Sequence, residues 1–394
     1  MGVGFGRRPT FPICYTQVMK IQENVVLAPY STLQIGGPAK YFAEVTNEGE
    51  LKEALTSAKG KNLQVFILGG GSNVLFADIG FDGLVVRPLM KGREVSPPLP
   101  SPYDKGRVGE GILIKVGAGE ELNGVVAWTV DSGWWGMENL SFIPGLTGAL
   151  VIQNVGAYGQ EASEIVESVE VFDTQDGSLR TFSKEQCGFT YRHSVFNTSE
   201  KGRYMILSVT LRLIKNGKPN ISYKDLQSYF GRESPSQSEV REAVIKIRSG
   251  KGQDWQALPS AGSFFSNFRL NKNDFDSLLA HIASNFNPDR ASELLALTQK
   301  IKAPSDDGLI KVPAAWILDN LLGLKGYMHN ERVCVSPYHA LNLINTGRAT
   351  ASDILDLFKY IRQLTYQKTG LILVNEPEFV GFEPEELKKY FALE

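Results

Sequence analysis

Two glycine-rich segments suggest chemistry more directly than any other part of the chain. The first places Gly69, Gly70 and Gly71 directly after an apolar run at 63–68, and the second, at 143–148, reads Ile-Pro-Gly-Leu-Thr-Gly. Because glycine has no Cβ, the backbone N–H groups of such segments can approach a phosphate or pyrophosphate closely. The two segments therefore predict a binder of a nucleotide cofactor.

The sequence around the first segment limits the kind of nucleotide fold. Residues 63–68 are typical of a buried strand, and the chain turns at the three glycines before the apolar residues 74–76. A Rossmann fold would then need a helix and an acidic residue about twenty positions later, whereas a second strand follows here at 83–87. A tight turn that requires positive φ explains the glycines equally well, so the segment alone leaves both interpretations open.

Composition excludes several classes of function. The chain has 394 residues, enough for two or three domains, and its net charge of −2 gives no basic surface for nucleic acid. It contains no apolar run of about eighteen residues that could span a membrane. Its three cysteines form no C-x-x-C pair, so we expect no disulfide framework, no metal site and a cytoplasmic location. Residues 1–18 lack a continuous apolar stretch, and we expect a disordered extension rather than a secretory signal.

Strand patterns dominate up to about residue 232 and helical patterns follow, which predicts an α+β protein. Strands at 166–172 and 178–182 flank the turn residues Asp-Thr-Gln-Asp-Gly and should form a hairpin. The proline-rich segment 96–102 is either a domain linker or a long hairpin loop. The remaining predicted elements are helices at 48–59, 236–248 and 352–367 and a last strand at 371–374.

Six motifs occur in the order that one enzyme family shows. They are Ser-Thr-Leu-Gln-Ile-Gly-Gly-Pro-Ala at 31–39, Gly-Gly-Gly-Ser-Asn at 69–73, Ile-Pro-Gly at 143–145 with Gln-Asn-Val-Gly-Ala-Tyr-Gly at 153–159, Tyr-Arg-His-Ser-Val-Phe at 191–196, Ala-Gly-Ser-Phe-Phe at 261–265 and Glu-Pro-Glu at 376–378. From about residue 19 to its end, the chain resembles the UDP-N-acetylenolpyruvoylglucosamine reductases, in their long-loop form. That family uses FAD and NADPH to reduce UDP-N-acetylglucosamine enolpyruvate to UDP-N-acetylmuramate, a precursor of peptidoglycan.

The resemblance implies a vanillyl-alcohol-oxidase-type FAD-binding fold of two α+β subdomains with an α+β substrate-binding domain. We expect FAD-binding subdomain 1 at 19–90, FAD-binding subdomain 2 at 91–232 and the substrate-binding domain at 233–370. A C-terminal strand at about 371–394 would return to the first subdomain. The protein is expected to be a monomer that binds FAD without a covalent bond.

The same resemblance assigns both glycine-rich segments to FAD. Backbone N–H groups of the first segment, with the side chains of Ser72 and Asn73, would hold the pyrophosphate, and the second segment would line the other side of the cofactor. The residues assigned to the cofactor are Gly69, Gly70, Gly71, Ser72, Asn73, Ile143, Pro144, Gly145, Gly148, Asn154, Gly156, Ala157 and Tyr158.

Reduction of an enolpyruvyl group makes two physical demands. Hydride addition to the terminal vinyl carbon pushes negative charge into the carboxylate, and a proton must then reach the neighbouring carbon. The resemblance assigns the stabilisation of this negative charge to Arg192 and Glu378. It assigns the donation of the proton to Ser263. The guanidinium fork suits a carboxylate, whereas Glu378 would have to be protonated to donate a hydrogen bond. From the pattern alone, Glu378 could equally be a surface residue of a strand, with Glu376 on the same face.

Substrate binding is assigned by resemblance to three further residues. Tyr223 resembles the tyrosine that closes over the diphosphate and sugar, and Lys251 resembles the lysine that contacts the phosphates of the UDP-sugar and of NADPH. Asn267 is expected to contact the substrate as well. The chain departs from the family pattern at 252–255 and at Phe268, and both departures flank the substrate side.

Two other functions stay open at this point. One is an FAD-dependent oxidase or dehydrogenase of the same fold that acts on a sugar or hydroxy acid. Many such enzymes tether FAD through histidine or cysteine, and no histidine is near either glycine-rich segment in the sequence. The four histidines, His193, His281, His329 and His339, have no obvious partner in the sequence, and we expect all four to be structural or surface residues. The other is a non-catalytic flavin-binding protein, which would not need Arg192, Ser263 and Glu378 together.

Overall fold

The structure is a computed structural model that describes residues 20–96, 111–231, 234–300 and 308–393. The extension expected at 1–18 lies outside the described residues, as does all but the first residue of the proline-rich segment. Within the described ranges, each helix is too short or too polar to cross a lipid bilayer.

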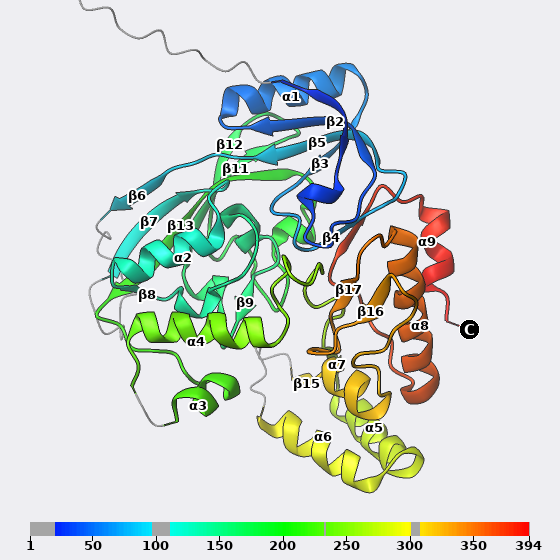
Figure 1. The fold of residues 1–394 in the computed structure, drawn as a ribbon. Coiled ribbons are helices and arrows are strands. Elements are labelled where there is room, and N and C mark those ends of the chain that lie inside the picture. Colours follow the sequence, from blue (N-terminus) through cyan, green and yellow to red (C-terminus); the bar gives the residue numbers. More distant parts are fainter. Residues whose placement is uncertain (1–19, 97–110, 232–233, 301–307, 394) are drawn as a thin grey trace, which may run out of the picture.

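The N-terminal part of the chain forms a four-stranded sheet under one helix (Figure 1). Strand β1 is antiparallel to β2, and both β2 and β3 are parallel to β5. Helix α1 begins where expected because the side chain of Asn47 accepts a hydrogen bond from Glu50 N. The elements are β1 (Gln22–Val26), η1 (Ala28–Tyr30), β2 (Pro38–Val45), α1 (Glu48–Gly60), β3 (Gln64–Ile67), β4 (Val74–Phe76) and β5 (Phe81–Pro88).

Strand β3 differs from its prediction in burial. It pairs only with β5 and is therefore the edge strand of its sheet. Its residues are exposed or half-buried, and Val65 is 38% exposed. The prediction of a strand is confirmed, but the prediction that it is buried is wrong, since an apolar run does not reveal whether a strand has one neighbour or two.

A second, antiparallel sheet has the order β12-β11-β13-β7-β6, and β8 also pairs with β13. The hairpin predicted around residues 173–177 is confirmed by the register of β11 with β12. Strands β6 and β7 pair antiparallel on either side of the proline-rich segment, which confirms the hairpin interpretation over the linker. The elements are β6 (Arg93–Ser96), β7 (Gly111–Gly117), α2 (Leu122–Asp131), β8 (Trp134–Trp135), η2 (Glu138–Leu140), η3 (Thr147–Val151), β9 (Gly156–Ala157), β10 (Gln160–Glu161), η4 (Ala162–Glu164), β11 (Val166–Asp173), β12 (Leu179–Ser183), η5 (Val195–Asn197) and β13 (Tyr204–Lys215).

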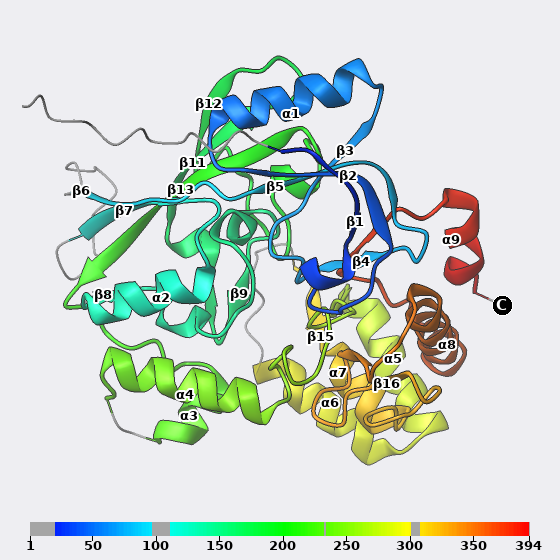
Figure 2. The same cartoon turned by 45° about the horizontal axis from the view of Figure 1, so that its top comes forward.

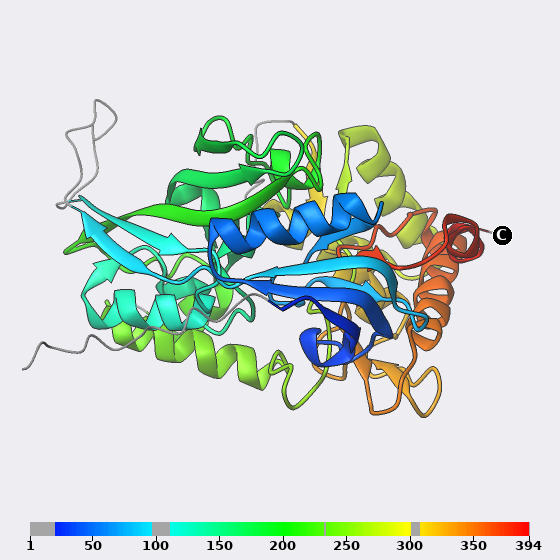
Figure 3. The same cartoon turned by 90° about the horizontal axis from the view of Figure 1, so that it is seen from above.

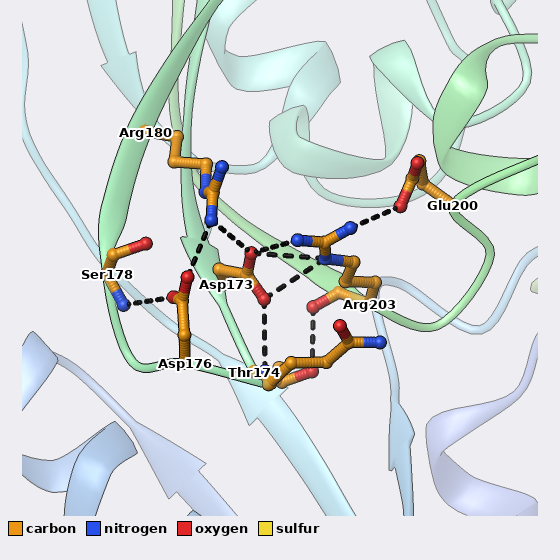
Figure 4. Close-up of polar contacts among 8 residues, drawn as sticks. Asp173, Thr174, Asp176, Ser178, Arg180, Glu200 and Arg203 are labelled. Carbon is orange, nitrogen blue, oxygen red and sulfur yellow. Dashed lines mark hydrogen bonds and ion pairs between the residues drawn. The ribbon is translucent and has the colours of Figure 1, made fainter.

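A buried carboxylate fastens the β11–β12 hairpin to β13 (Figure 4). Asp173 is 0% exposed and accepts hydrogen bonds from Arg203, with Nη2 at 2.8 Å. Arg180 lies 3.0 Å from the same carboxylate, and Gln175 N donates to it at 3.0 Å. The hydrogen bonds from Arg203 hold the pKa of Asp173 below its usual range. The cluster therefore fixes the end of the sheet as long as the Asp173 carboxyl group is ionised, which is the form that these hydrogen bonds favour.

Helix α4 packs against α2 and η2, beneath the second sheet (Figure 2). Its N-terminus is fixed by a capping box between Ser236 and Glu239. The adjoining helix α3 contacts α4. These two helices are α3 (Lys224–Phe230) and α4 (Gln237–Gly250).

The remaining residues form a helical region around one large apolar core. Helix α8, which confirms the helix predicted at 352–367, presents an apolar stripe to this core: Ile354, Leu357, Phe358 and Ile361 are fully buried. A capping box at Thr350 starts the helix, and Gly370 in the left-handed conformation ends it. The elements are β14 (Phe268–Leu270), α5 (Lys272–Asn285), α6 (Pro288–Lys300), β15 (Ile310–Val312), α7 (Ala314–Trp316), the π-helix η6 (Ile317–Leu321), β16 (Val333–Val335), β17 (Leu343–Asn345) and α8 (Ala351–Thr369).

The C-terminal segment crosses back to the N-terminal sheet region, as the view from above shows (Figure 3). Strand β18 (Glu378–Val380) pairs in parallel with β4, and helix α9 (Pro384–Phe391) follows. The strand predicted at 371–374 is wrong, because these residues form no ladder; instead Ser266 N donates to Val374 O at 2.9 Å. The chain end thereby joins the helical region to the segment that carries the glycine triplet.

Candidate active site

A cavity of about 1510 Å³ lies where the N-terminal sheet, the second sheet and the helical region meet. Segments far apart in the sequence form its wall: residues 66–74, parts of 143–156, residues 191–193, parts of 260–270 and residues 374–379. Typical small-molecule pockets have volumes of about 300–1000 Å³. The cavity is thus large enough for a dinucleotide and part of a second ligand.

The two glycine-rich segments contact each other at the wall of this cavity. Gly71 has φ +65°, and a Cβ on it would lie 1.8 Å from Tyr30 O. A Cβ on Gly70 would lie 2.3 Å from the Cα of Gly145. By contrast, a Cβ on Gly69 would meet only the Cβ of Ala149, at 3.3 Å. Gly70 and Gly71 are therefore required by packing within the protein, whether or not a phosphate approaches them.

Asn73 connects the glycine triplet to two other parts of the wall. Its Nδ2 donates to Gln153 Oε1 at 2.9 Å and to Glu376 O at 3.1 Å. Its carbonyl accepts from Glu378 N at 3.0 Å. Ser72 Oγ, which also lines the cavity, is 3.4 Å from Pro144 O. The side chains assigned to the pyrophosphate thus also hold the wall together.

The residues assigned to the cofactor from the second segment divide into two groups. Ile143, Pro144 and Gly156 line the cavity. Asn154 is buried and donates to Glu161 and to Thr190 O, so that it supports the wall from behind. The others that lie outside the lining are Gly145, Gly148, Ala157 and Tyr158.

Arg192 lies at the cavity on a short turn. Thr190 and His193 form an antiparallel bridge around it, and Arg192 itself has φ +61°, a conformation that favours glycine. Its Nη2 donates to Gly156 O at 3.2 Å, and its Nε is 3.8 Å from Glu376 Oε2. The guanidinium is therefore held by two partners from distant parts of the chain, Gly156 of β9 and Glu376 in the segment before β18.

Glu376, to which the sequence assigned no role, lies beside Arg192 in the structure. Only 14% of its side chain is exposed, and burial raises its pKa, although Arg192 and Lys311 oppose the shift. Lys311 also lies over the ring of Tyr191, 4.3 Å from its centroid. The spacing of Glu376 and Glu378 was visible in the sequence, but nothing there indicated which of them faces the arginine.

Glu378 and Ser263 both line the cavity, as Arg192 does. Glu378 Oε1 is 2.8 Å from Lys201 Nζ, and both side chains are about half exposed. Ser263 follows Gly262, which has φ +70°, and forms an antiparallel bridge with Asn342. The structure therefore brings the three predicted catalytic residues into one cavity from three parts of the chain.

The three predicted substrate residues are placed differently. Asn267 lines the cavity; it donates to Tyr191 Oη at 3.1 Å and accepts from Ala314 N at 3.1 Å. Tyr223 and Lys251 lie outside the lining. Tyr223 is 46% exposed, and Lys251 Nζ is 2.5 Å from Asp225 Oδ2.

Several lining residues were not assigned a role from the sequence. Arg248, one turn before Lys251, faces the cavity, donates to Phe142 O at 3.2 Å and has its pKa lowered by burial. The lining also includes His193 and His281, two of the four histidines predicted to be structural or surface residues. The unusual residues Gln253, Trp255 and Phe268 line it as well. In the described part of the chain, no cluster of three or more side chains could hold a metal ion.

A wide cavity walled by two glycine-rich segments, between two α+β parts and a third region, is the architecture of an FAD-binding flavoprotein. Residues 39–183 match the FAD binding domain family, and residues 253–380 match the C-terminal domain of UDP-N-acetylenolpyruvoylglucosamine reductase. The chain therefore carries an FAD-binding domain, in agreement with the fold class predicted from the sequence.

Curated relatives named UDP-N-acetylenolpyruvoylglucosamine reductase align with nearly the whole chain. That of Saccharopolyspora erythraea is 36% identical over 90% of this chain and 94% of its own length. The relative from Pseudomonas aeruginosa is 32% identical over 91% of this chain and 98% of its own length. The crystal structure of the reductase from Thermus caldophilus superposes with a TM-score of 0.59 at 24% identity and covers 92% of this chain and 99% of that one. The chain belongs to the UDP-N-acetylenolpyruvoylglucosamine reductase family.

Proposed function

We propose that this protein reduces UDP-N-acetylglucosamine enolpyruvate to UDP-N-acetylmuramate with FAD and NADPH, in the synthesis of peptidoglycan precursors. The observation that supports it best is the meeting of Arg192, Ser263 and Glu378 in one cavity beside both glycine-rich segments. Bound FAD would supply the hydride, which it takes from NADPH. We further propose that the protein acts in the cytoplasm as a monomer.

The residues that would hold FAD are those of the glycine-rich wall. Gly69 faces the cavity without a side chain and, of the three glycines, is the one whose Cβ position is least obstructed by protein backbone. Ser72 and Asn73 follow it along the wall, and Ile143, Pro144 and Gly156 lie on the facing segment. Backbone N–H groups and these polar side chains suit a pyrophosphate, and the apolar residues suit a flavin ring.

Arg192 would bind the enolpyruvyl carboxylate and stabilise the charge that develops there. Its Nη2 and Nε face Gly156 O and Glu376, so the guanidinium plane is fixed before the substrate arrives. Preorganised donors of this kind need no rearrangement when charge develops. Glu378 would add a hydrogen bond to the same charge in its protonated form, after exchanging its contact with Lys201.

Ser263 would give the proton to the carbon next to the carboxylate. It lines the cavity, and the bridge to Asn342 fixes its backbone. Tyr223 and Lys251 would bind the diphosphate and sugar, which requires the substrate to extend beyond the cavity toward α3 and α4. Asn267 would contact the substrate inside the cavity.

The two half-reactions provide the test. The flavin of Ser263→Ala should be reduced by NADPH at the parent rate. It should fail to reoxidise when the UDP-sugar is added, because only this second step needs a proton for the substrate carbon. Ser266→Ala is the matched control, since its hydroxyl donates to Val374 O at 3.2 Å. Stopped-flow absorbance of the flavin reports both steps. Reoxidation of Ser263→Ala at the rate of the control would remove the proposed proton donor.

A further inference from the structure

Asn342 carries a buried side-chain amide for which the described residues provide no partner. It is 1% exposed, and both Nδ2 and Oδ1 lack a hydrogen bond within the described part of the chain. Its backbone, in contrast, is fully engaged: N donates to His339 O at 3.1 Å and O accepts from Ser336 N at 2.8 Å. An unpaired buried amide is costly, so its presence at a cavity wall indicates a polar partner during function.

Asn342 is paired across the cavity wall with Ser263, the proposed proton donor. Ser263 and Asn342 are opposite residues of an antiparallel bridge, and Phe264 N donates to Leu341 O at 2.8 Å on one side of it. This hydrogen bond flanks the pair, which makes it a non-hydrogen-bonded pair, the closer of the two antiparallel arrangements. Side chains of such a pair project from the same face of the ladder, and both residues line the cavity.

We propose that Asn342 is a positioning residue for Ser263, whose Oγ accepts a hydrogen bond from Asn342 Nδ2 during proton transfer. This rests on the proposed role of Ser263. The Oγ–H bond breaks while the electron pair of the enolate forms the new C–H bond, and the O–H electron pair stays on Oγ. The resulting alkoxide regains a proton from water as the product leaves.

The amide supplies what a serine hydroxyl needs in order to act as an acid. A donor placed in advance at Oγ stabilises the negative charge that appears there. A neutral donor does so without attracting the substrate carboxylate away from Arg192, as a lysine or arginine at this position would. Directly opposite residues of an antiparallel pair have Cβ atoms about 4.5–5.5 Å apart, a separation that the side chains of Asn342 and Ser263 can span across their bridge.

Asn342→Leu tests this with nearly unchanged shape and no polar group left unpaired. Reduction by NADPH should stay within about twofold of the parent, whereas reoxidation by the UDP-sugar should slow by about ten- to a hundredfold, the loss of one hydrogen bond to a charged group. The solvent deuterium isotope effect on reoxidation should rise. Asn342→Asp, which replaces the donor by an acceptor, should reoxidise more slowly still. This variant is the one to use for the test if Asn342→Leu does not retain flavin.

A double-mutant cycle separates positioning from direct binding of the substrate. Any slow residual reoxidation that Ser263→Ala retains should be unchanged by Asn342→Leu, because the group that Asn342 acts through is gone. An undiminished loss in the Ser263→Ala background, or full-rate reoxidation of Asn342→Leu with Ser263 present, would overturn the proposal while leaving the function intact. Full-rate reoxidation of Ser263→Ala alone would instead refute the role of Ser263.

Discussion

The backbone of Arg192 allows its chemistry and its strain to be measured separately. With φ +61°, it occupies the third position of the turn between Thr190 and His193, where glycine is normally preferred. A non-glycine residue in this conformation costs about 1–2 kcal/mol. Glycine would relieve that strain but would lose about 0.4–1 kcal/mol through the greater freedom of the unfolded chain.

Two truncations of the same side chain make use of this difference. Arg192→Ala and Arg192→Gly both remove the contacts to Gly156 O and Glu376. The glycine variant should therefore be the more stable of the two by about 1 kcal/mol, the balance of the strain and entropy terms. In a chain of 394 residues that is a difference of about 1 °C in thermal midpoint.

Catalysis should not distinguish the two truncations. Both should reoxidise about 10²–10³ times more slowly than the parent, the usual loss when a preorganised donor to a developing anion is removed. Arg192→Lys should lie between them and the parent, because it keeps a charge but not the fork. Thermal unfolding at equal FAD concentration and stopped-flow reoxidation supply both readings. An alanine variant as stable as the glycine variant would show that the turn is unstrained, and near-parent reoxidation of either would refute the contact with the carboxylate.

Three shorter predictions follow from other contacts. Acid precipitation should release all of the flavin as free FAD; flavin retained in the pellet would point first to His193, which lines the cavity. Lys251→Ala should raise KM for both the UDP-sugar and NADPH in steady-state assays, whereas Asp225→Asn, which frees Lys251, should lower both. Asp173→Asn should destabilise the fold by about 2 kcal/mol at neutral pH. Because its pKa is lowered, this deficit should shrink as the pH falls below about 4 in unfolding experiments, and a deficit that stays constant in acid would contradict the assignment.

Elements with a strong local signal were predictable from the sequence. Helices α1 and α8 combine apolar periodicity with N-caps at Asn47 and Thr350, and both form within a few residues of the predicted bounds. The hairpin at β11 and β12 follows from its turn residues. The edge position of β3 and the absence of a strand at 371–374 were not predictable, because both depend on which distant segment lies alongside.

The candidate site was predictable as a set of residues but not as a set of contacts. The resemblance to the family assigned Arg192, Ser263 and Glu378, yet their neighbours Asn342 and Lys201 have no distinguishing local pattern. Those neighbours are brought close only by the crossing of the C-terminal segment and by the bridge between residues 263 and 342. For the glycine triplet, the sequence indicated the importance of the residues but not its cause. Packing of Gly71 against Tyr30 and of Gly70 against Gly145 requires glycine there, whether or not a phosphate binds.

The charged residues assigned to the substrate share one further property. Each lies near an opposite charge of the same chain: Arg192 Nε is 3.8 Å from Glu376, Glu378 is 2.8 Å from Lys201, and Lys251 is 2.5 Å from Asp225. A partly buried charge without a partner would be costly, and these contacts limit that cost. The substrate carboxylate and diphosphate would then compete with Glu376 and Asp225 for the same cations.

The binding free energy in such a site is the difference between the ion pairs that the ligand forms and the internal ion pairs that it breaks. A ligand with a single negative group can displace only one of the acidic residues and gains little. A ligand that carries a carboxylate and a diphosphate at the right separation displaces both Glu376 and Asp225. The internal ion pairs would therefore select for a substrate that carries both anionic groups, which is why removing an acidic partner should tighten binding but reduce discrimination against simpler anions.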